Sequence, residues 1–192
     1  MQQKRESADF FGHHFVEIVP ALVPLYAKQS FFKQIAGIRI EGVAELYIEQ
    51  NQIAFERGEL QLTDYGVSGI PIFQLSRFAT KALKQKKKVH LFLDFLPDKT
   101  EEETITLLEK RLHKIEQKKT MAECLIGLFP RKLAEVLLKE AGIALGDSPK
   151  KIEQKKIEAL AEVVKHLRVD ITGSRSFEQA QVCAGGIDTR EI

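Results

Sequence analysis

The stretch GELQLTDYGVSGIPIFQLSR, residues 58–77, changes from a strand pattern to a helix pattern. Apolar and polar residues alternate over residues 60–62, which is typical of a half-buried strand. Gly66 and Gly69 follow and predict a turn, because glycine adopts positive φ without penalty. Pro71 then favours the first turn of a helix, where its missing amide costs nothing. We expect mainly β structure before this stretch and mainly α structure after it.

The residues before this stretch predict β strands. A short strand is expected at residues 15–19. Residues 37–49 and 53–62 then form the two arms of a hairpin, because both alternate apolar and polar side chains. We expect Gly42 to mark a bulge or crossover and Gly58 to interrupt the second arm.

After the hairpin we expect a helix at residues 71–83 and a further strand at residues 88–96. At Pro97 the apolar period changes from two to 3.6 and stays there for about seventy residues. Thr100 followed by Glu103 is typical of a capping box, in which hydroxyl and carboxylate each accept a backbone amide.

Three more helix starts follow within this α segment. Thr120 and Glu123 repeat the capping-box spacing, and Pro130 starts the next helix, for which Gly142 suits the C-terminal cap. Residues 148–149, Ser-Pro, are expected to begin the last helix. Four amphipathic helices of this kind bury a small core against one another.

The C-terminal residues predict a return to β structure. An extended segment carries Val169 and Ile171, residues 172–174 suggest a turn, and residues 179–184 read as a strand ending at the glycine pair 185–186. The chain is therefore predicted to be α+β, with a β domain interrupted by a bundle of about four helices. The expected parts are a β-rich domain with one helix (residues 1–97), the bundle (98–167) and strands returning to the β domain (168–192).

The composition narrows the classes of function. The chain has 192 residues, 44% of them hydrophobic, which is enough for one good core. It contains no apolar run of the roughly 20 residues that a transmembrane helix needs, and its N-terminus lacks a signal-peptide core. We therefore predict a cytoplasmic protein without a membrane partner. The 29 basic and 27 acidic residues give a net charge of only +2, which argues against binding nucleic acid through phosphate contacts.

No metal site is predicted from the sequence. A metal site normally needs three or four converging ligands. His13 and His14 are adjacent, whereas the other three histidines, His90, His113 and His166, fall on different expected elements. Cys124 and Cys183 lie far apart and are expected to be reduced packing residues.

Four stretches resemble one known family in order and spacing. They are residues 58–77 above, PALVPL at residues 20–25, LDFLPDKTEEE at residues 93–103, and SRSFEQAQVCAGGIDTREI at residues 174–192. They resemble the inserted domain of a bacterial flavoprotein family that includes aminoacetone oxidases and bile-acid-inducible flavoproteins. The resemblance covers nearly the whole chain but only the middle of such an enzyme, without the flavin-binding halves on either side.

The resemblance implies a small closed β-barrel that packs over an FAD ring, with the helices further out. It implies an FAD-dependent oxidoreductase as the parent protein, whose FAD-binding domain is the partner and whose substrate is an unidentified small molecule. Ala184, Gly185 and Gly186 are the implied cofactor-binding candidates. Tyr65, Gly66, Ser68 and Gly69 are the implied substrate-side candidates.

The residues themselves leave a plainer interpretation open. Glycines at a turn or strand end are required by backbone geometry whether or not a cofactor is near, and a tyrosine is more often a packing residue than a catalytic acid. The chain has no GxGxxG motif and no catalytic triad in a supporting context, so no catalytic residue is predicted. We expect the chain alone to bind no flavin and to be inactive. The alternative is an autonomous module that binds a protein or nucleic acid.

Overall fold

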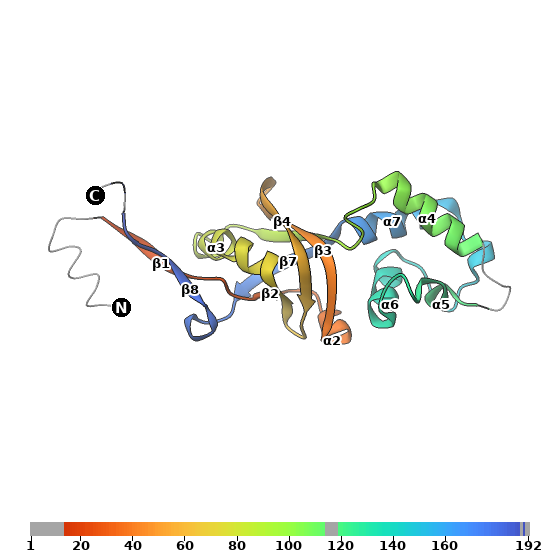
Figure 1. Ribbon diagram of the computed structural model, residues 1–192, viewed down its shortest axis with the longest axis horizontal. Helices are drawn as coiled ribbons and strands as arrows, with labels where there is room; N and C mark the ends of the chain where they lie inside the picture. The colour runs from red at the N-terminus through yellow and green to blue at the C-terminus, as the bar shows by residue number, and fades with distance from the viewer. Residues whose placement is uncertain (1–13, 114–118, 189, 191–192) are drawn as a thin grey trace.

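The computed structural model describes residues 14–113, 119–188 and 190. It has three parts in a row: a two-stranded ribbon, a closed barrel and a group of helices (Figure 1). The resemblance implied a closed barrel, and the structure confirms it. None of the helices in the described part of the chain is long and apolar enough to cross a membrane.

The barrel has six antiparallel strands in the order β2-β5-β4-β3-β6-β7. Its strands are β2 (Leu25–Ala27), β3 (Ile38–Ile48), β4 (Asn51–Leu62), β5 (Gly66–Ser68), β6 (Val89–Asp94) and β7 (Leu167–Ser174). Alternating side chains of these strands point inward and are buried, as the period of two predicted.

The predicted β3–β4 hairpin is confirmed, but its irregularity lies elsewhere than expected. The register is continuous from Ile38 opposite Leu62 and shifts only between Leu46 and Tyr47. Gly42 is therefore not the bulge, and Gly58, which lies opposite Gly42, does not interrupt the second arm. A Cβ at Gly42 would lie 2.6 Å from the Asp94 carbonyl oxygen, so glycine allows β3 and β6 to approach closely there.

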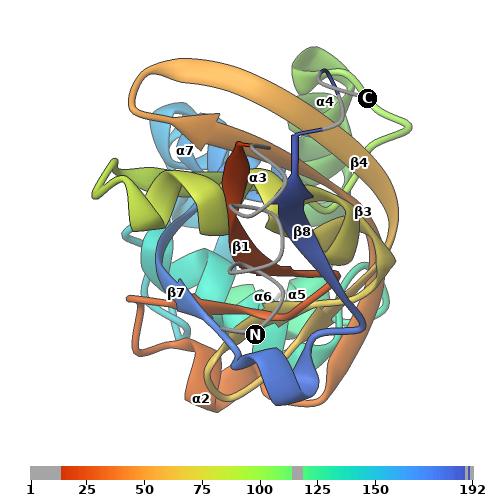
Figure 2. The ribbon, with the colours of Figure 1, turned by 90° about the vertical axis from the view of Figure 1, so that its left-hand side faces the viewer.

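Helix α3 (Ile70–Lys84) closes one end of the barrel. It contacts β3, β4, β5, β6 and β7 of the barrel and also β1 of the ribbon. Viewed from the ribbon side, α3 lies across the barrel behind the ribbon (Figure 2). Its Ile72, Leu75 and Ala79 are fully buried, as the helical spacing predicted. A short helix, α2 (Phe32–Ile35), links β2 to β3.

The helical part follows β6 and precedes β7. It consists of α4 (Glu101–His113), α5 (Met121–Leu125), α6 (Arg131–Glu140), a 3-10 turn η1 (Pro149–Lys151) and α7 (Gln154–Lys165). Both predicted capping boxes are present, at Thr100 and at Thr120. Buried side chains of the helices and the barrel form one continuous core, so the two parts are packed together.

Three sequence predictions about local structure are wrong. The last helix begins at Gln154, because Pro149 starts a separate 3-10 turn. Residues 172–174 are not a turn, because β7 runs through them with β2 as its partner. The segment Gly66–Ser68 is strand β5, and the turn lies before it, at residues 63–65.

The last strand also differs from the prediction. Residues Phe177–Gln179 form a second 3-10 turn, η2, and β8 spans Val182–Ile187, so its glycine pair lies inside the strand. Strand β8 pairs with β1 (Phe15–Ala21) in a ribbon outside the barrel. The return to the barrel is made instead by β7.

Candidate functional site

The turn before β5 is held by Thr63. Its hydroxyl accepts the Gly66 amide at 3.1 Å and donates to the Gly66 carbonyl at 2.9 Å, while the Thr63 amide donates to that carbonyl at 2.8 Å. A Cβ at Gly66 would lie 2.3 Å from the Leu25 carbonyl oxygen of β2. Gly66 is therefore required by the close pairing of β2 and β5.

Gly69 and Ser68 also have structural roles. Gly69 precedes α3 with a φ of 101°, and a Cβ there would lie 2.3 Å from the Glu59 carbonyl oxygen. Ser68 is buried and pairs with Gln61 in the barrel. Among the four substrate-side candidates, Tyr65 is the one whose side chain is partly exposed and can meet a ligand.

Tyr65 belongs to a cluster that the sequence did not predict, here called the Tyr–Arg cluster, made of Tyr26, Tyr65 and Arg175. The two tyrosine rings meet edge to face with centroids 5.5 Å apart. The Arg175 guanidinium lies 4.3 Å from the Tyr65 ring centroid and 5.8 Å from that of Tyr26. Hydrogen bonding to Tyr65 raises the pKa of Arg175 above its usual value. The cluster can therefore present a fixed cation and two aromatic rings.

A shallow recess of about 310 Å³ adjoins Tyr65. Its walls come from the start of β3 and the end of β4 with the turn that follows. Arg39 lines the recess, and its guanidinium nitrogen lies 3.3 Å from a Glu59 carboxylate oxygen. The recess is open to solvent along the barrel rim and offers both polar and apolar groups.

The cofactor candidates lie on the ribbon. Ala184 is opposite Val19, and Gly186 is opposite Val16. A Cβ at Gly185 would lie 2.4 Å from the Glu17 carbonyl oxygen, so strand pairing requires this glycine. Gly186 differs, because a Cβ there would meet no atom within 4 Å. Its backbone is open to close approach by another molecule.

The two candidate groups lie on different parts of the molecule. The turn at residues 63–65 and β5 belong to the barrel, and the glycine pair belongs to the ribbon (Figure 1). Helix α3 contacts both β1 of the ribbon and β5 of the barrel. It is tied to the ribbon segment by the Thr80 hydroxyl, which donates to the Pro20 carbonyl at 2.9 Å.

The two cysteines differ in burial. Cys124 is buried in α5, and burial raises the pKa of its thiol. Cys183 is exposed on β8, so it is not the packing residue that the sequence suggested. Both cysteines are free thiols.

Comparisons with known proteins agree with this architecture. A family model described as "HI0933-like protein barrel and H2TH domain" matches residues 19–182. The chain is 34% identical to a 3-dehydro-bile acid delta(4,6)-reductase of Clostridium scindens, over 94% of this chain and 44% of that protein. It is 26% identical to a ribosomal RNA dihydrouridine synthase of Haemophilus influenzae, over 96% of this chain and 43% of that protein. The chain thus spans less than half the length of these relatives.

Proposed function

Because the chain belongs to the HI0933-like barrel and H2TH family, we propose that it is the substrate-side domain of an FAD-dependent oxidoreductase. In this role it covers the flavin and shapes the substrate pocket, and it is inactive without the flavin-binding part of the parent protein. The observation that carries the proposal is the 34% identity to a reductase that is more than twice as long as the matched region. The four motifs of the flavoprotein resemblance support the same role.

The ribbon is the surface that we assign to the flavin-binding part. Val16, Val182 and Ile187 are large apolar side chains that the ribbon leaves 38%, 48% and 44% exposed. A two-stranded ribbon is at best marginally stable in water by itself, so covering these side chains with another domain stabilises it. Gly186 lies among them with open space beside its backbone, which fits the close approach of a flat ring.

The chemistry of such an enzyme is a hydride transfer that the flavin supplies when it is bound. The residues of this chain bind the substrate, orient it and exclude water. The partly exposed Tyr65 and the recess beside it are the groups that we assign to the substrate. Arg175 holds the Tyr65 ring in place, and its charge favours an anionic or electron-rich substrate group.

A chimera tests the proposal. The chain replaces the matched region of the Clostridium scindens reductase, and two quantities are measured: the flavin absorbance retained after desalting, and KM for the reductase's substrate. We expect the chimera to retain flavin and to show a changed KM, because the pocket walls have changed. A chimera that retains flavin with an unchanged KM and substrate range would mean that this domain does not shape the pocket.

A matched pair of glycine variants tests the ribbon in the same chimera. Gly186 and Gly142 both have positive φ, and a Cβ at either position meets no atom within 4 Å. Gly186→Ala and Gly142→Ala each strain a positive-φ backbone on a different part of the molecule, and the strain is greater at Gly186, whose φ of 123° lies outside the left-handed helical region that Gly142 occupies at 69°. We expect Gly186→Ala to weaken flavin retention and Gly142→Ala to leave it unchanged. Equal effects of the two variants on flavin retention would show that the ribbon is not part of the flavin site.

A second candidate function is nucleic-acid binding. It is favoured by the relatives named as ribosomal RNA dihydrouridine synthases and by the exposed lysines of residues 84–88. A module of this kind would bind RNA with an affinity that falls steeply as salt is added, because phosphate contacts release counterions. An electrophoretic shift of a single-stranded RNA that disappears between low and physiological salt would support this candidate over the first.

A further inference from the structure

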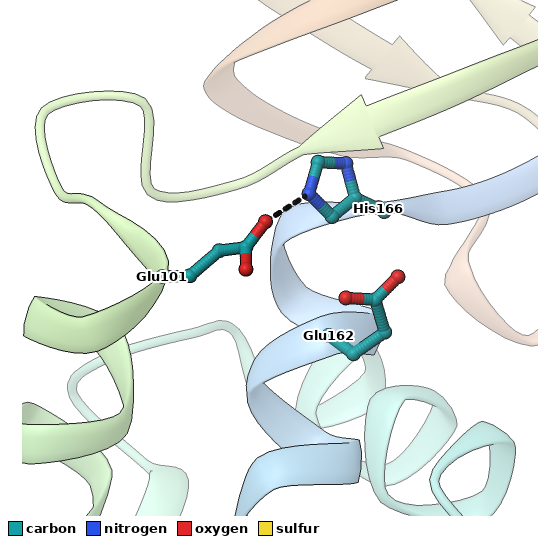
Figure 3. Close-up of side chains that lie close together, drawn as sticks. All are labelled: Glu101, Glu162 and His166. Carbon is teal, nitrogen blue, oxygen red and sulfur yellow. Dashed lines mark hydrogen bonds and ion pairs between the residues drawn. The ribbon is translucent and has the colours of Figure 1, made fainter.

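Three side chains of metal-ligating type converge where the helices join the barrel. Glu101 of α4, Glu162 of α7 and His166 each offer one ligand atom, and these atoms all lie within 4.8 Å of one another (Figure 3). The His166 Nε2 is 3.0 Å from a Glu101 carboxylate oxygen. We call this group the Glu–Glu–His cluster. It is separate from the Tyr–Arg cluster and from the ribbon.

Two of the three groups come from the end of one helix. Glu162 lies in the last turn of α7, and His166, four residues later, is the residue at which the helix ends. The His166 amide donates to the Glu162 carbonyl at 2.7 Å, which fixes the backbone between them. His166 is the last residue before β7, and a ring of the barrel, Phe92, lies edge-on with its centroid 6.2 Å from the imidazole centroid. Phe92 limits the orientations open to the imidazole.

Glu101 is brought to this helix end by a clamp on the preceding loop. Lys165, the neighbour of His166, donates to the Asp94 carboxylate at 2.6 Å and to the carbonyls of Leu96 and Lys99 at 3.0 and 2.6 Å. These three acceptors lie on the segment that leads from β6 into α4. The clamp therefore holds the start of α4 against the end of α7.

The first turn of α4 is fixed as well. The Thr100 amide donates to the Glu103 carboxylate at 2.9 Å, and the Glu103 amide donates to the Thr100 hydroxyl at 3.1 Å. Glu101 is the first residue of the helix that this capping box begins. The backbones of all three ligand residues are thus positioned by contacts that do not involve the ligand atoms.

We propose that the Glu–Glu–His cluster is a Zn²⁺ site that joins the helical part to the barrel. Zn²⁺ binds imidazole nitrogen and carboxylate oxygen at about 2.0 to 2.2 Å, and a tetrahedral site places such ligands about 3.4 Å apart. His166 and Glu101 form a hydrogen-bonded pair whose 3.0 Å separation is close to this value, and all three ligand atoms lie within 4.8 Å of one another. Water completes the coordination, because Glu101 is 63% exposed.

The ligand types decide between metal classes. An imidazole ligand suits Zn²⁺ and neighbouring transition metals, whereas Ca²⁺ and Mg²⁺ prefer oxygen alone. The two carboxylates balance the charge of a divalent ion. The sequence predicted no metal site because the histidines are scattered. His166 is the one histidine used here, and its partners are carboxylates, one of them 65 residues away in the sequence.

Binding of Zn²⁺ to the chain tests this proposal. The measurements use the 192-residue chain in a Cys183→Ser background, which removes the exposed thiol as a competing ligand. Isothermal titration gives the stoichiometry, and the melting temperature is recorded with and without Zn²⁺. We expect one ion per chain and a rise in melting temperature of about 5 to 10 °C at a free Zn²⁺ concentration about 100 times Kd.

Substitutions of the ligand residues test whether the Glu–Glu–His cluster is the site that binds Zn²⁺. His166→Ala and the isosteric Glu101→Gln should each weaken Zn²⁺ binding at least about tenfold and abolish the rise in melting temperature. Glu102→Gln is the matched control, because Glu102 is exposed in the same helical turn but outside the cluster, and it should bind like the parent chain. Melting without metal shows that each variant folds. The proposal is overturned if the parent chain does not bind Zn²⁺, if His166→Ala binds equally well, or if Glu102→Gln loses as much affinity as Glu101→Gln.

Discussion

Lys165 is a buried charged residue at the junction between helices and barrel. Its side chain is 8% exposed, and its ammonium donates to Asp94, whose side chain is 15% exposed, and to two backbone carbonyls. A buried ion pair adds little over an apolar pair of the same shape, but removing one partner leaves the other charge buried and unpaired. Removing the ammonium is therefore far more costly than the net value of the pair.

Lys165→Met should lower the free energy of unfolding by about 3 to 5 kcal/mol, measured by urea denaturation at pH 7. Lys84→Met is the control, because Lys84 pairs with Glu17 on the surface, where the two side chains are 49% and 71% exposed. It should cost less than about 1 kcal/mol. Similar losses for both variants would show that the Lys165 clamp is not important for stability.

At the residue scale, the sequence predicted where the backbone requires glycine better than it predicted which side chains meet in a site. Glycine at positions 66 and 69 was expected from backbone geometry, and the structure gives the reason, because a Cβ at either position would lie 2.3 Å from a carbonyl oxygen. No local sequence pattern indicated that Arg175 and Tyr26 belong to a site. They meet Tyr65 only because β2, β5 and β7 are neighbours in the barrel, which no local pattern encodes. The Glu–Glu–His cluster was missed for the same reason.

At the element scale, the capping box at Thr120 was correctly predicted from spacing. The Glu123 carboxylate accepts the Thr120 amide at 2.8 Å and the Thr120 hydroxyl at 2.9 Å. The hydrogen bond from the amide, followed by that from the hydroxyl, lowers the pKa of Glu123 below its usual range. A lowered pKa contributes stability that is present above the usual glutamate range and is lost as the pH falls through the folded value.

Thr120→Ala should therefore raise the pKa of Glu123 partway toward its usual range, because the hydroxyl donor is lost and the amide donor remains. The stability of this variant should also depend less on pH in the acidic range. Thr120→Ser keeps the hydroxyl and serves as the control. Carboxyl NMR titration measures both pKa values, and an identical Glu123 titration in the two variants would contradict this account of the cap.

Two strand boundaries that the sequence placed wrongly share a physical cause. Gly173 suggested a turn, yet β7 continues because β2 pairs with it on one side. The pair Gly185 and Gly186 suggested a strand end, yet β8 continues because it pairs with β1 on both sides of a register shift, Gly186 with Val16 and Ala184 with Val19. In both cases a neighbouring strand overrides the local preference of glycine. Three of the four helix starts expected after Pro97 are correct, because caps are local in sequence, and the exception is the last, where Pro149 begins a 3-10 turn.

The ribbon should be the least protected element of the chain alone. Four of the six residues of β8 are exposed, and its pairing partner is β1 alone, whereas β6 lies between β3 and β7 in the barrel. Amide hydrogens of β8 should therefore exchange at least about tenfold faster than those of β6. Hydrogen exchange followed by mass spectrometry measures both segments. Equal protection would mean that the ribbon is stable without a covering domain.

At the scale of the whole molecule, the α+β class and the interruption of a β domain by helices were predictable from periodicity. Closure of the barrel was not, because strand order depends on contacts between distant segments, such as Leu91 with Leu46 and with Val169. It was implied only by the family resemblance, which the family match over residues 19–182 confirms. The continuous core from barrel to helices likewise follows from tertiary packing.

The central claim is that this domain covers a flavin held by another part of the enzyme. The most direct test is a visible absorption spectrum of the purified chain, before and after incubation with excess FAD and desalting. We predict a colourless protein that retains no flavin, because the chain has no glycine-rich turn for the dinucleotide phosphates. A yellow protein that keeps its chromophore through desalting would contradict the account, since the chain would then complete a flavin site by itself.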